Sequence, residues 1–349
     1  MTKLFTEGLF AARIGDACPV CRGVMSIAPV DPNVPQRRRE SHTFGYTRCG
    51  PVKSRQVAYF LIAALVLVCS LPGLALAARR HAAEAVSAAT ISAAQGTLVR
   101  WSVPGTERCG MHKRSWPALH ETCYYPVDVL QKPGLVTITR SSRGHRESAQ
   151  ILVTPSQYET QEIDLGNIPQ ANPSSEDRRR AAREEEVVDK VWKHREGPAS
   201  FTLPLGAPLR PMPKGRDFGA NRIFNGKPAG QPHMGADYTA PEGSDVRAVD
   251  SGTVALAEDQ FFSGNAVYID HGNGLISMYF HLSKVKVRAG QEVKKGDILG
   301  LVGSTGRSTG AHLFFGVRWH DARLNPQFLF EDPSRIPAVG QQATPAAHD

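Results

Sequence analysis

Residues 264–283 read GNAVYIDHGNGLISMYFHLS, which is two runs of β-branched and aromatic residues on either side of a glycine-containing turn. Runs of this length and composition, bounded by such turns, are typical of β-strands. Further short runs of the same character lie at residues 245–249, 252–257 and 298–302. We therefore predict an all-β or nearly all-β domain over residues 200–331.

Four side chains in this domain can bind a metal ion or carry a proton: His233, Asp237, His281 and His312. A catalytic zinc needs about three imidazole or carboxylate ligands and a fourth position for water. A single histidine in a strand is more often structural than catalytic. The presence of all four in one β domain is what indicates a metal or proton-transfer site.

The domain resembles the lysostaphin-type zinc endopeptidases of peptidoglycan, whose fold is also called the duplicated hybrid motif. The resemblance covers residues 201–330 and rests on a series of short motifs in register. These are Phe218-Gly219, RIFNG (222–226), PHMGAD (232–237), APEG (240–243), IDHG (269–272), YFHLS (279–283), GQEV (290–293) and GSTGRSTG (303–310).

The resemblance implies zinc as the cofactor and assigns His233 and Asp237 as two of its ligands. It implies that His281 assists catalysis and that His312, the first histidine of a His-x-His motif, polarises the water or the transition state. The second histidine of that motif is the third ligand in the family, and Phe314 occupies its position here. A phenyl ring cannot coordinate zinc, although His312 could turn inward as a replacement ligand.

Two functions remain open at this point, beside a purely structural envelope domain. The first is an active zinc endopeptidase that cleaves the peptide crosslinks of the cell wall. The second is a catalytically degenerate domain that binds peptidoglycan or activates another wall hydrolase. Retention of four of the five site residues favours the first, and Phe314 favours the second.

Residues 52–78 predict export. Lys53 and Arg55 precede an apolar run at residues 57–69, which is followed by a small-residue segment ending in Ala75-Leu76-Ala77. This is the order of a secretory signal peptide with its cleavage site. An uncleaved inner-membrane anchor is the alternative. Either places the rest of the chain in the periplasm or cell envelope. Residues 1–51 are an uncertain tail or a misassigned start, in which Cys18, Cys21 and Cys49 are poor metal-site candidates.

The remaining segments are less informative. The formal net charge of +8 suits an anionic polymer such as peptidoglycan, and no basic stripe interleaved with aromatic residues indicates nucleic acid. Residues 92–168 predict a small β domain, in which Cys109 and Cys123 are expected to form a disulfide in an oxidising compartment. Residues 174–196 predict a charged linker helix, and residues 332–349 a disordered tail.

Overall fold

The computed structural model describes residues 25–27, 44–46, 50–51, 89–193 and 197–340. The first three segments form a small antiparallel sheet, β1 (Met25–Ile27), β2 (Phe44–Tyr46) and β3 (Gly50–Pro51). The predicted signal peptide or anchor at 52–78 lies outside the described residues, as do Cys18, Cys21 and Cys49. No helix among the described residues is both long and apolar enough to cross a membrane.

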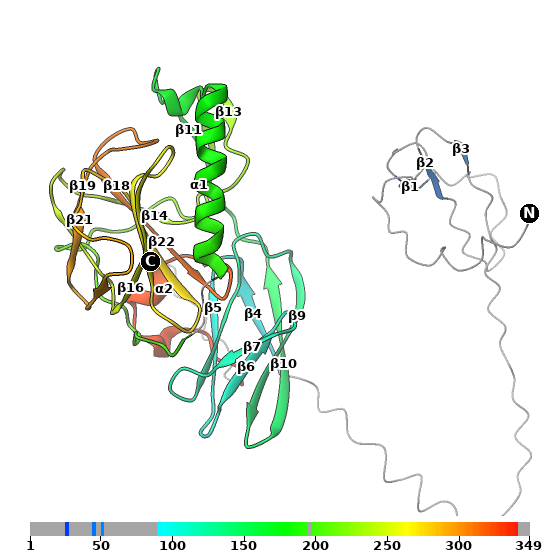
Figure 1. Cartoon of the computed structure of the whole chain (residues 1–349). Helices are drawn as coiled ribbons and strands as arrows, with labels where there is room; N and C mark the ends of the chain where they lie inside the picture. The colour runs from blue at the N-terminus through cyan, green and yellow to red at the C-terminus, as the bar shows by residue number, and fades with distance from the viewer. Residues whose placement is uncertain (1–24, 28–43, 47–49, 52–88, 194–196, 341–349) are drawn as a thin grey trace, which may run out of the picture. The chain divides into compact units, whose positions relative to one another are not determined.

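The chain from residue 89 onward is mainly β, as predicted, and begins with a small β domain (Figure 1). Its five-stranded sheet has the order β4-β10-β9-β6-β7, and β5 pairs with β8 beside it. Cys109 on β6 and Cys123 on β8 form a disulfide that joins the two sheets. The strands are β4 (Thr90–Ala94), β5 (Leu98–Ser102), β6 (Arg108–Met111), β7 (Arg114–Pro117), β8 (Thr122–Pro126), β9 (Gly134–Ser142) and β10 (His145–Thr154).

A connecting region follows, and it contains the one long helix of the described chain, α1 (Ser175–Lys193). The helix begins with a capping box, because the Ser174 hydroxyl accepts a hydrogen bond from the Asp177 N–H while the Asp177 carboxylate accepts one from the Ser174 N–H. Before it lie β11 (Thr160–Ile163) and η2 (Pro169–Ala171). β11 pairs with β12 (Asn221–Phe224), which in turn pairs with β13 (Lys227–Pro228).

The C-terminal domain is built on a large antiparallel sheet of order β14-β22-β18-β17-β16-β20, with β23 added beside β22. A second, three-stranded sheet has the order β15-β21-β19. The strands are β14 (Ala236–Thr239), β15 (Asp245–Arg247), β16 (Gly252–Gln260), β17 (Gly264–Asp270), β18 (Leu275–Leu282), β19 (Lys284–Val285), β20 (Glu292–Val293), β21 (Ile298–Leu301), β22 (His312–Trp319) and β23 (Ala322–Leu324).

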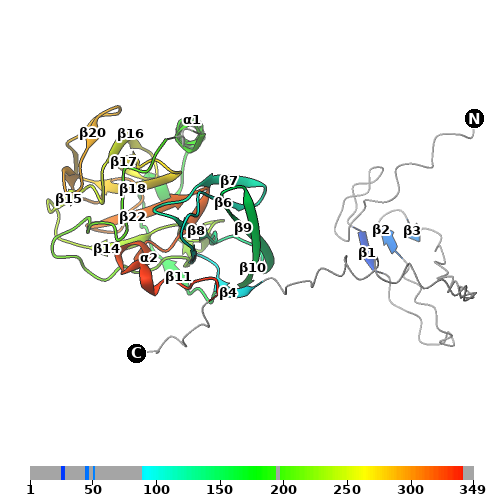
Figure 2. The same cartoon turned by 90° about the horizontal axis from the view of Figure 1, so that it is seen from below.

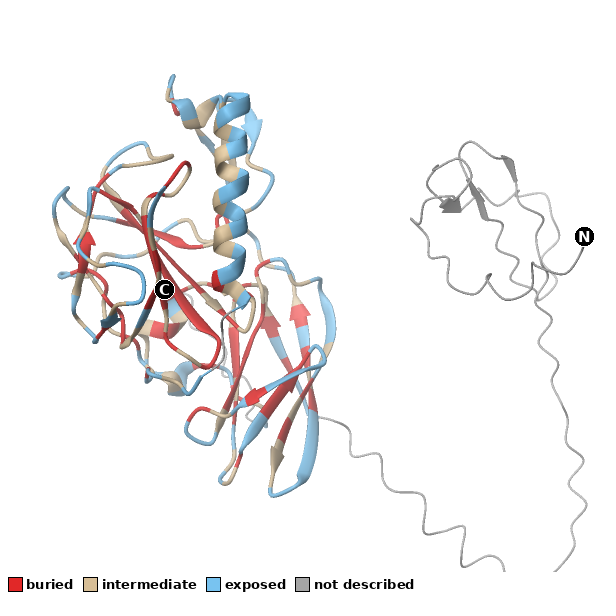
Figure 3. Ribbon diagram, in the orientation of Figure 1, coloured by how far each residue is buried: buried red, intermediate tan, exposed pale blue. Residues whose placement is uncertain are grey.

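The large sheet has two different faces, because side chains alternate along each strand. One face, with Tyr238 and Phe315, belongs to the main core, which also contains Val246 and Leu299 of the smaller sheet. The other face carries a separate apolar cluster that includes Phe314 and is partly covered by α1. In Figure 2 the helix is seen nearly end-on beside β16 and β17, and in Figure 3 its outer side is largely exposed.

The last elements of the described residues are α2 (Gln327–Phe330) and η3 (Pro333–Arg335), and the tail that follows is described as far as residue 340. Ile336 and Ala338 are buried, and the backbone N–H of Arg100 donates a hydrogen bond to the Pro337 carbonyl at 2.9 Å. The expectation of disorder over 332–349 is therefore wrong for residues 332–340. Composition gave no sign of this, because the segment is held by the small β domain rather than by its own sequence neighbours.

Candidate metal centre

His233 and Asp237 face each other at the start of β14. The Nδ1 atom of His233 lies 2.9 Å from the carbonyl oxygen of Asp217, so it donates a proton there and the lone pair is on Nε2. That Nε2 atom is 3.4 Å from Oδ1 of Asp237. Both of these atoms are buried and neither has a hydrogen-bond partner. Buried polar atoms are usually satisfied, so this pair is a candidate for binding a ligand.

His312 lies on the same face because of the register between β14 and β22. Asp237 pairs with Phe314, and Thr239 with His312. The Nε2 atom of His312 is 3.6 Å from Oδ1 of Asp237, and its Nδ1 atom is 2.8 Å from the Gly310 carbonyl. His312 therefore also points a lone pair into the site.

His281 completes the group from the end of β18. Its backbone has a φ of 64°, an uncommon conformation for a residue other than glycine, and its N–H donates to the Ser263 carbonyl at 2.9 Å. Its Nδ1 atom is 2.8 Å from the Thr305 carbonyl, and its ring centroid is 4.9 Å from that of His312. Burial, and then the proximity of His312, lower the pKa of His281 to about 4, so the ring is neutral at neutral pH.

Phe314 fills the space beside these side chains. Its ring is buried and lies stacked on that of Phe280, with centroids 4.7 Å apart and an interplanar angle of 3°. The His233 ring is 5.2 Å away and meets it edge-on. Phe314 belongs to the apolar cluster on which α1 packs, so it joins the site to that cluster.

Arg222, on β12, is part of the site although no role was predicted for it. Its Nη2 atom is 2.5 Å from Oδ2 of Asp237 and 3.8 Å from the carboxylate of Asp217. Burial alone raises the pKa of Asp237, but its contact with His233 and the positive charge of Arg222 outweigh this effect and hold that pKa well below its usual range. Asp237 is therefore ionised at neutral pH.

The side chains of His233, Asp237 and His312 have the chemistry of zinc ligands, but they are not arranged as a complete metal site. A tetrahedral zinc with bonds of about 2.0–2.1 Å places its ligand atoms roughly 3.3–3.4 Å apart, close to the 3.4 and 3.6 Å separations from Oδ1 of Asp237. The carbonyl partners of His233 and His312 are the outer contacts that metal-binding histidines usually make. Nevertheless, no group of three or more His, Cys, Asp or Glu side chains between residues 89 and 340, outside the gap at 194–196, is arranged to hold a metal.

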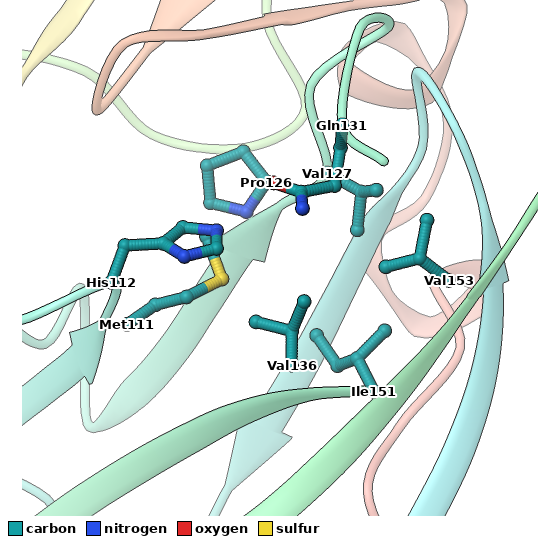
Figure 4. Close-up of a pocket in the computed structure, with 8 residues that line it drawn as sticks. All are labelled: Met111, His112, Pro126, Val127, Gln131, Val136, Ile151 and Val153. Carbon is teal, nitrogen blue, oxygen red and sulfur yellow. The ribbon is translucent and has the colours of Figure 1, made fainter. Parts of the chain in front are cut away.

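The small β domain contains a crevice outside the site described above. This apolar crevice is lined by Met111, Val136, Ile151 and Val153, with His112 at its edge (Figure 4). It has no room even for a water molecule. It is therefore part of the packing of that domain rather than a second candidate site.

Comparison with known proteins shows what the part of the chain that carries this site is similar to. Residues 231–326 match the model of peptidase family M23. Over 94 residues, 27% of this chain, the sequence is 44% identical to a DD-carboxypeptidase/endopeptidase, Mpg, of Neisseria meningitidis. Over 84 residues, 24% of the chain, it is 43% identical to the peptidoglycan DD-endopeptidase ShyA of Vibrio cholerae. The matched segments span 22% and 20% of those two proteins, about a fifth of their length.

A solved structure extends the similarity beyond this segment. A Pseudomonas aeruginosa protein assigned to peptidase M23 aligns with 68% of this chain and 94% of its own, with a TM-score of 0.54 and 26% sequence identity. The alignment therefore covers more of the chain than the peptidase domain alone.

Proposed function

The chain carries a lysostaphin-type domain of peptidase family M23, and from this we propose that it is a zinc-dependent endopeptidase acting on the peptide crosslinks of bacterial peptidoglycan. The similar proteins from Neisseria and Vibrio, whose names describe peptidoglycan or DD-peptide cleavage, support the substrate class. The pair of unsatisfied buried atoms, Nε2 of His233 and Oδ1 of Asp237, is the observation that carries the proposal.

We infer that His233 and Asp237, with His312 as the third ligand, would hold the metal, because the Nε2 atoms of His233 and His312 lie 3.4 and 3.6 Å from Oδ1 of Asp237. A zinc ion there would supply a Lewis acid for the scissile carbonyl and lower the pKa of a bound water. His281 would move the proton. It is neutral, and its Nδ1–H is engaged with the Thr305 carbonyl, which leaves Nε2 free to accept a proton and pass it to the leaving amine.

Arg222 has a double effect in this arrangement. Its ion pair orients the Asp237 carboxylate, which favours a fixed site. The same positive charge repels a divalent cation and already neutralises the negative charge of the Asp237 carboxylate. We therefore expect weaker zinc binding than in a site with three ligands and no such cation.

A second candidate function is favoured by Phe314. Its ring is buried between Phe280 and His233 and puts a hydrocarbon surface where the family resemblance expects a ligand. A domain of this kind can hold a peptidoglycan peptide without cutting it, or activate another wall hydrolase. Both candidates act in the cell envelope, in agreement with the export signal predicted at 52–78, cleaved or retained in the inner membrane.

Zinc content and cleavage, measured on one preparation, separate the two candidates. We expect about one zinc per chain and release of peptide fragments from purified sacculi, both abolished by His233→Ala. A zinc-free protein that binds sacculi but releases nothing would instead establish the second candidate. A protein that does not sediment with sacculi at all would contradict both.

A further inference from the structure

Arg307 is held between two aromatic rings that come from distant parts of the chain. Its guanidinium carbon lies 4.4 Å from the ring centroid of Phe224, at the end of β12, and 4.7 Å from that of Phe262, in the turn between β16 and β17. Arg307 itself belongs to the loop between β21 and β22. Contacts of this type immobilise a guanidinium and leave its N–H groups available for a ligand.

No carboxylate compensates this cation. In the described part of the chain Arg307 takes part in no ion pair, and the charged group that acts on it is a second cation, Arg222. Burial and this neighbour lower the pKa of Arg307, although a guanidinium remains charged at neutral pH. A half-buried charge without a partner is costly, and a bound anion would remove that cost.

The position of Arg307 connects it to the candidate metal centre from two sides. Thr305, two residues earlier, receives the Nδ1–H of His281 at its carbonyl, and Ser263, next to Phe262, accepts the backbone N–H of the same histidine. On the other side, Phe224 lies two residues after Arg222 on β12, so both side chains share one face of that strand. Arg307 is thus linked to His281 through the loop residue Thr305, and to the strand that carries Arg222 through its contact with Phe224.

We propose that Arg307 is a specificity residue that binds a carboxylate of the peptide in this site. Arginine pairs with carboxylates through two parallel N–H bonds, and the Phe224 and Phe262 rings fix the guanidinium for this contact. The inference rests on the proposed function, because it needs a peptidoglycan peptide in the site. The inference goes further by naming the group of the peptide that is recognised, which is either its terminal α-carboxylate or an acid group on one of its side chains.

Peptide binding, measured by calorimetry on the protein without any need for cleavage, tests this. The probe is a synthetic peptidoglycan stem peptide with all its carboxylates free, compared with the same peptide amidated at the C-terminus or at each side-chain acid. We expect one amidation to weaken binding by about tenfold or more, and the amidated position identifies the carboxylate. Because this arm uses the unaltered protein, it does not depend on the folding of a variant.

Substitutions then assign the effect to the residue. Arg307→Gln should weaken binding of the free peptide by about tenfold and leave binding of the sensitive amidated peptide unchanged. Arg307→Lys should have an intermediate effect. Arg288→Gln, at an exposed arginine, is the matched control and should change neither. Equal binding of all amidated peptides, or equal loss in Arg307→Gln for free and amidated peptides, would overturn the inference while the proposed function stands. Absence of binding to both stem peptide and sacculi would overturn both.

Discussion

We propose that Phe314 controls whether the site can hold a metal, because its ring lies against His233, whose Nε2 atom, like Oδ1 of Asp237, has no hydrogen-bond partner. Loss of a mere outer contact of a zinc ligand reduces metal affinity by about 10–100-fold. We therefore expect Phe314→His to raise zinc affinity by at least about 100-fold and to increase peptide release from sacculi. Competition with a chromogenic chelator measures the affinity. His233→Ala in the same background should cancel the gain, and a variant that stays zinc-free would show that no latent site exists.

The same substitution should weaken the fold, since it replaces a buried ring that is stacked on Phe280. Replacing buried aromatic side chains by much smaller ones costs about 3–5 kcal/mol, and histidine keeps part of the ring volume. We expect a loss of about 1–3 kcal/mol in the free energy of unfolding without zinc, measured by urea denaturation in the presence of a chelator. Unchanged stability would mean that the stack contributes little.

His271 predicts how stability depends on pH. It is fully buried, with Nδ1 2.7 Å from the Ser251 carbonyl and Nε2 2.7 Å from the Ser277 hydroxyl, and burial lowers its pKa to about 4. Between about pH 6.5 and 4 the unfolded chain therefore binds a proton that the folded chain does not. Stability should fall as the pH drops through this window, by up to about 3 kcal/mol from this residue.

Denaturation at several pH values, compared with His271→Asn, isolates this contribution. The variant should be less stable at pH 7 and should show a shallower decline from pH 6.5 to 4. Parallel curves for the two proteins would contradict the assignment to His271.

At the level of elements, α1 is attached to the sheet by few contacts, and each joins residues that are far apart in the sequence. Val191 is buried in the cluster that contains Phe314, and Glu184 accepts a hydrogen bond from the backbone N–H of Phe261 at 2.8 Å. Arg180 adds an exposed pair with Asp259, which contributes little. The rest of the helix surface is charged and exposed, so its packing depends on one narrow stripe.

We expect Val191→Asp to detach this helix, because it places an unpaired carboxylate in an apolar cluster. Trypsin should then cut within the arginine-rich first half of α1 at least about tenfold faster, since proteolysis follows the open population. Glu186→Ala, at an exposed position of the same helix, should not change the rate. Equal rates for Val191→Asp and the unaltered protein would show that the stripe does not hold the helix.

These elements also show what the sequence could predict. The strands around the turn at 270–274 follow from local alternation and glycine placement, and the four metal or proton carriers from their residue types. The stack of Phe280 on Phe314 depends on the register between β18 and β22, which brings together residues 34 positions apart. The contacts of His233 with the Asp217 carbonyl and of Arg222 with Asp237 cross loops of irregular shape. No local pattern encodes them, so the roles of Arg222 and Arg307 were missed although their motifs were recognised.

At the level of the whole molecule, the small β domain and the C-terminal domain share a core. Leu98, Leu119 and Tyr124 of the first belong to the main apolar cluster of the second, and the Tyr124 ring stacks on Trp319 at 5.3 Å. Beside them, Asp128 binds Arg323 through two side-chain contacts of 2.8 Å and accepts the Arg323 backbone N–H at 2.7 Å. Because both side chains are mostly buried, removal of one partner would cost more than it does in an exposed ion pair.

Calorimetry of the whole chain tests whether the two domains unfold together. The shared core predicts a single cooperative transition for residues 89–340 rather than one for each domain. Asp128→Ala should cost about 1–3 kcal/mol, because it leaves Arg323 without its partner at the interface, and should lower Tm by roughly 3–10 °C. Glu159→Ala, at an exposed acidic residue, should leave Tm unchanged. Two separate transitions in the unaltered protein would mean that the small β domain is an independent module, and its contacts with Trp319 and Arg323 would then hold it in place without stabilising the peptidase fold.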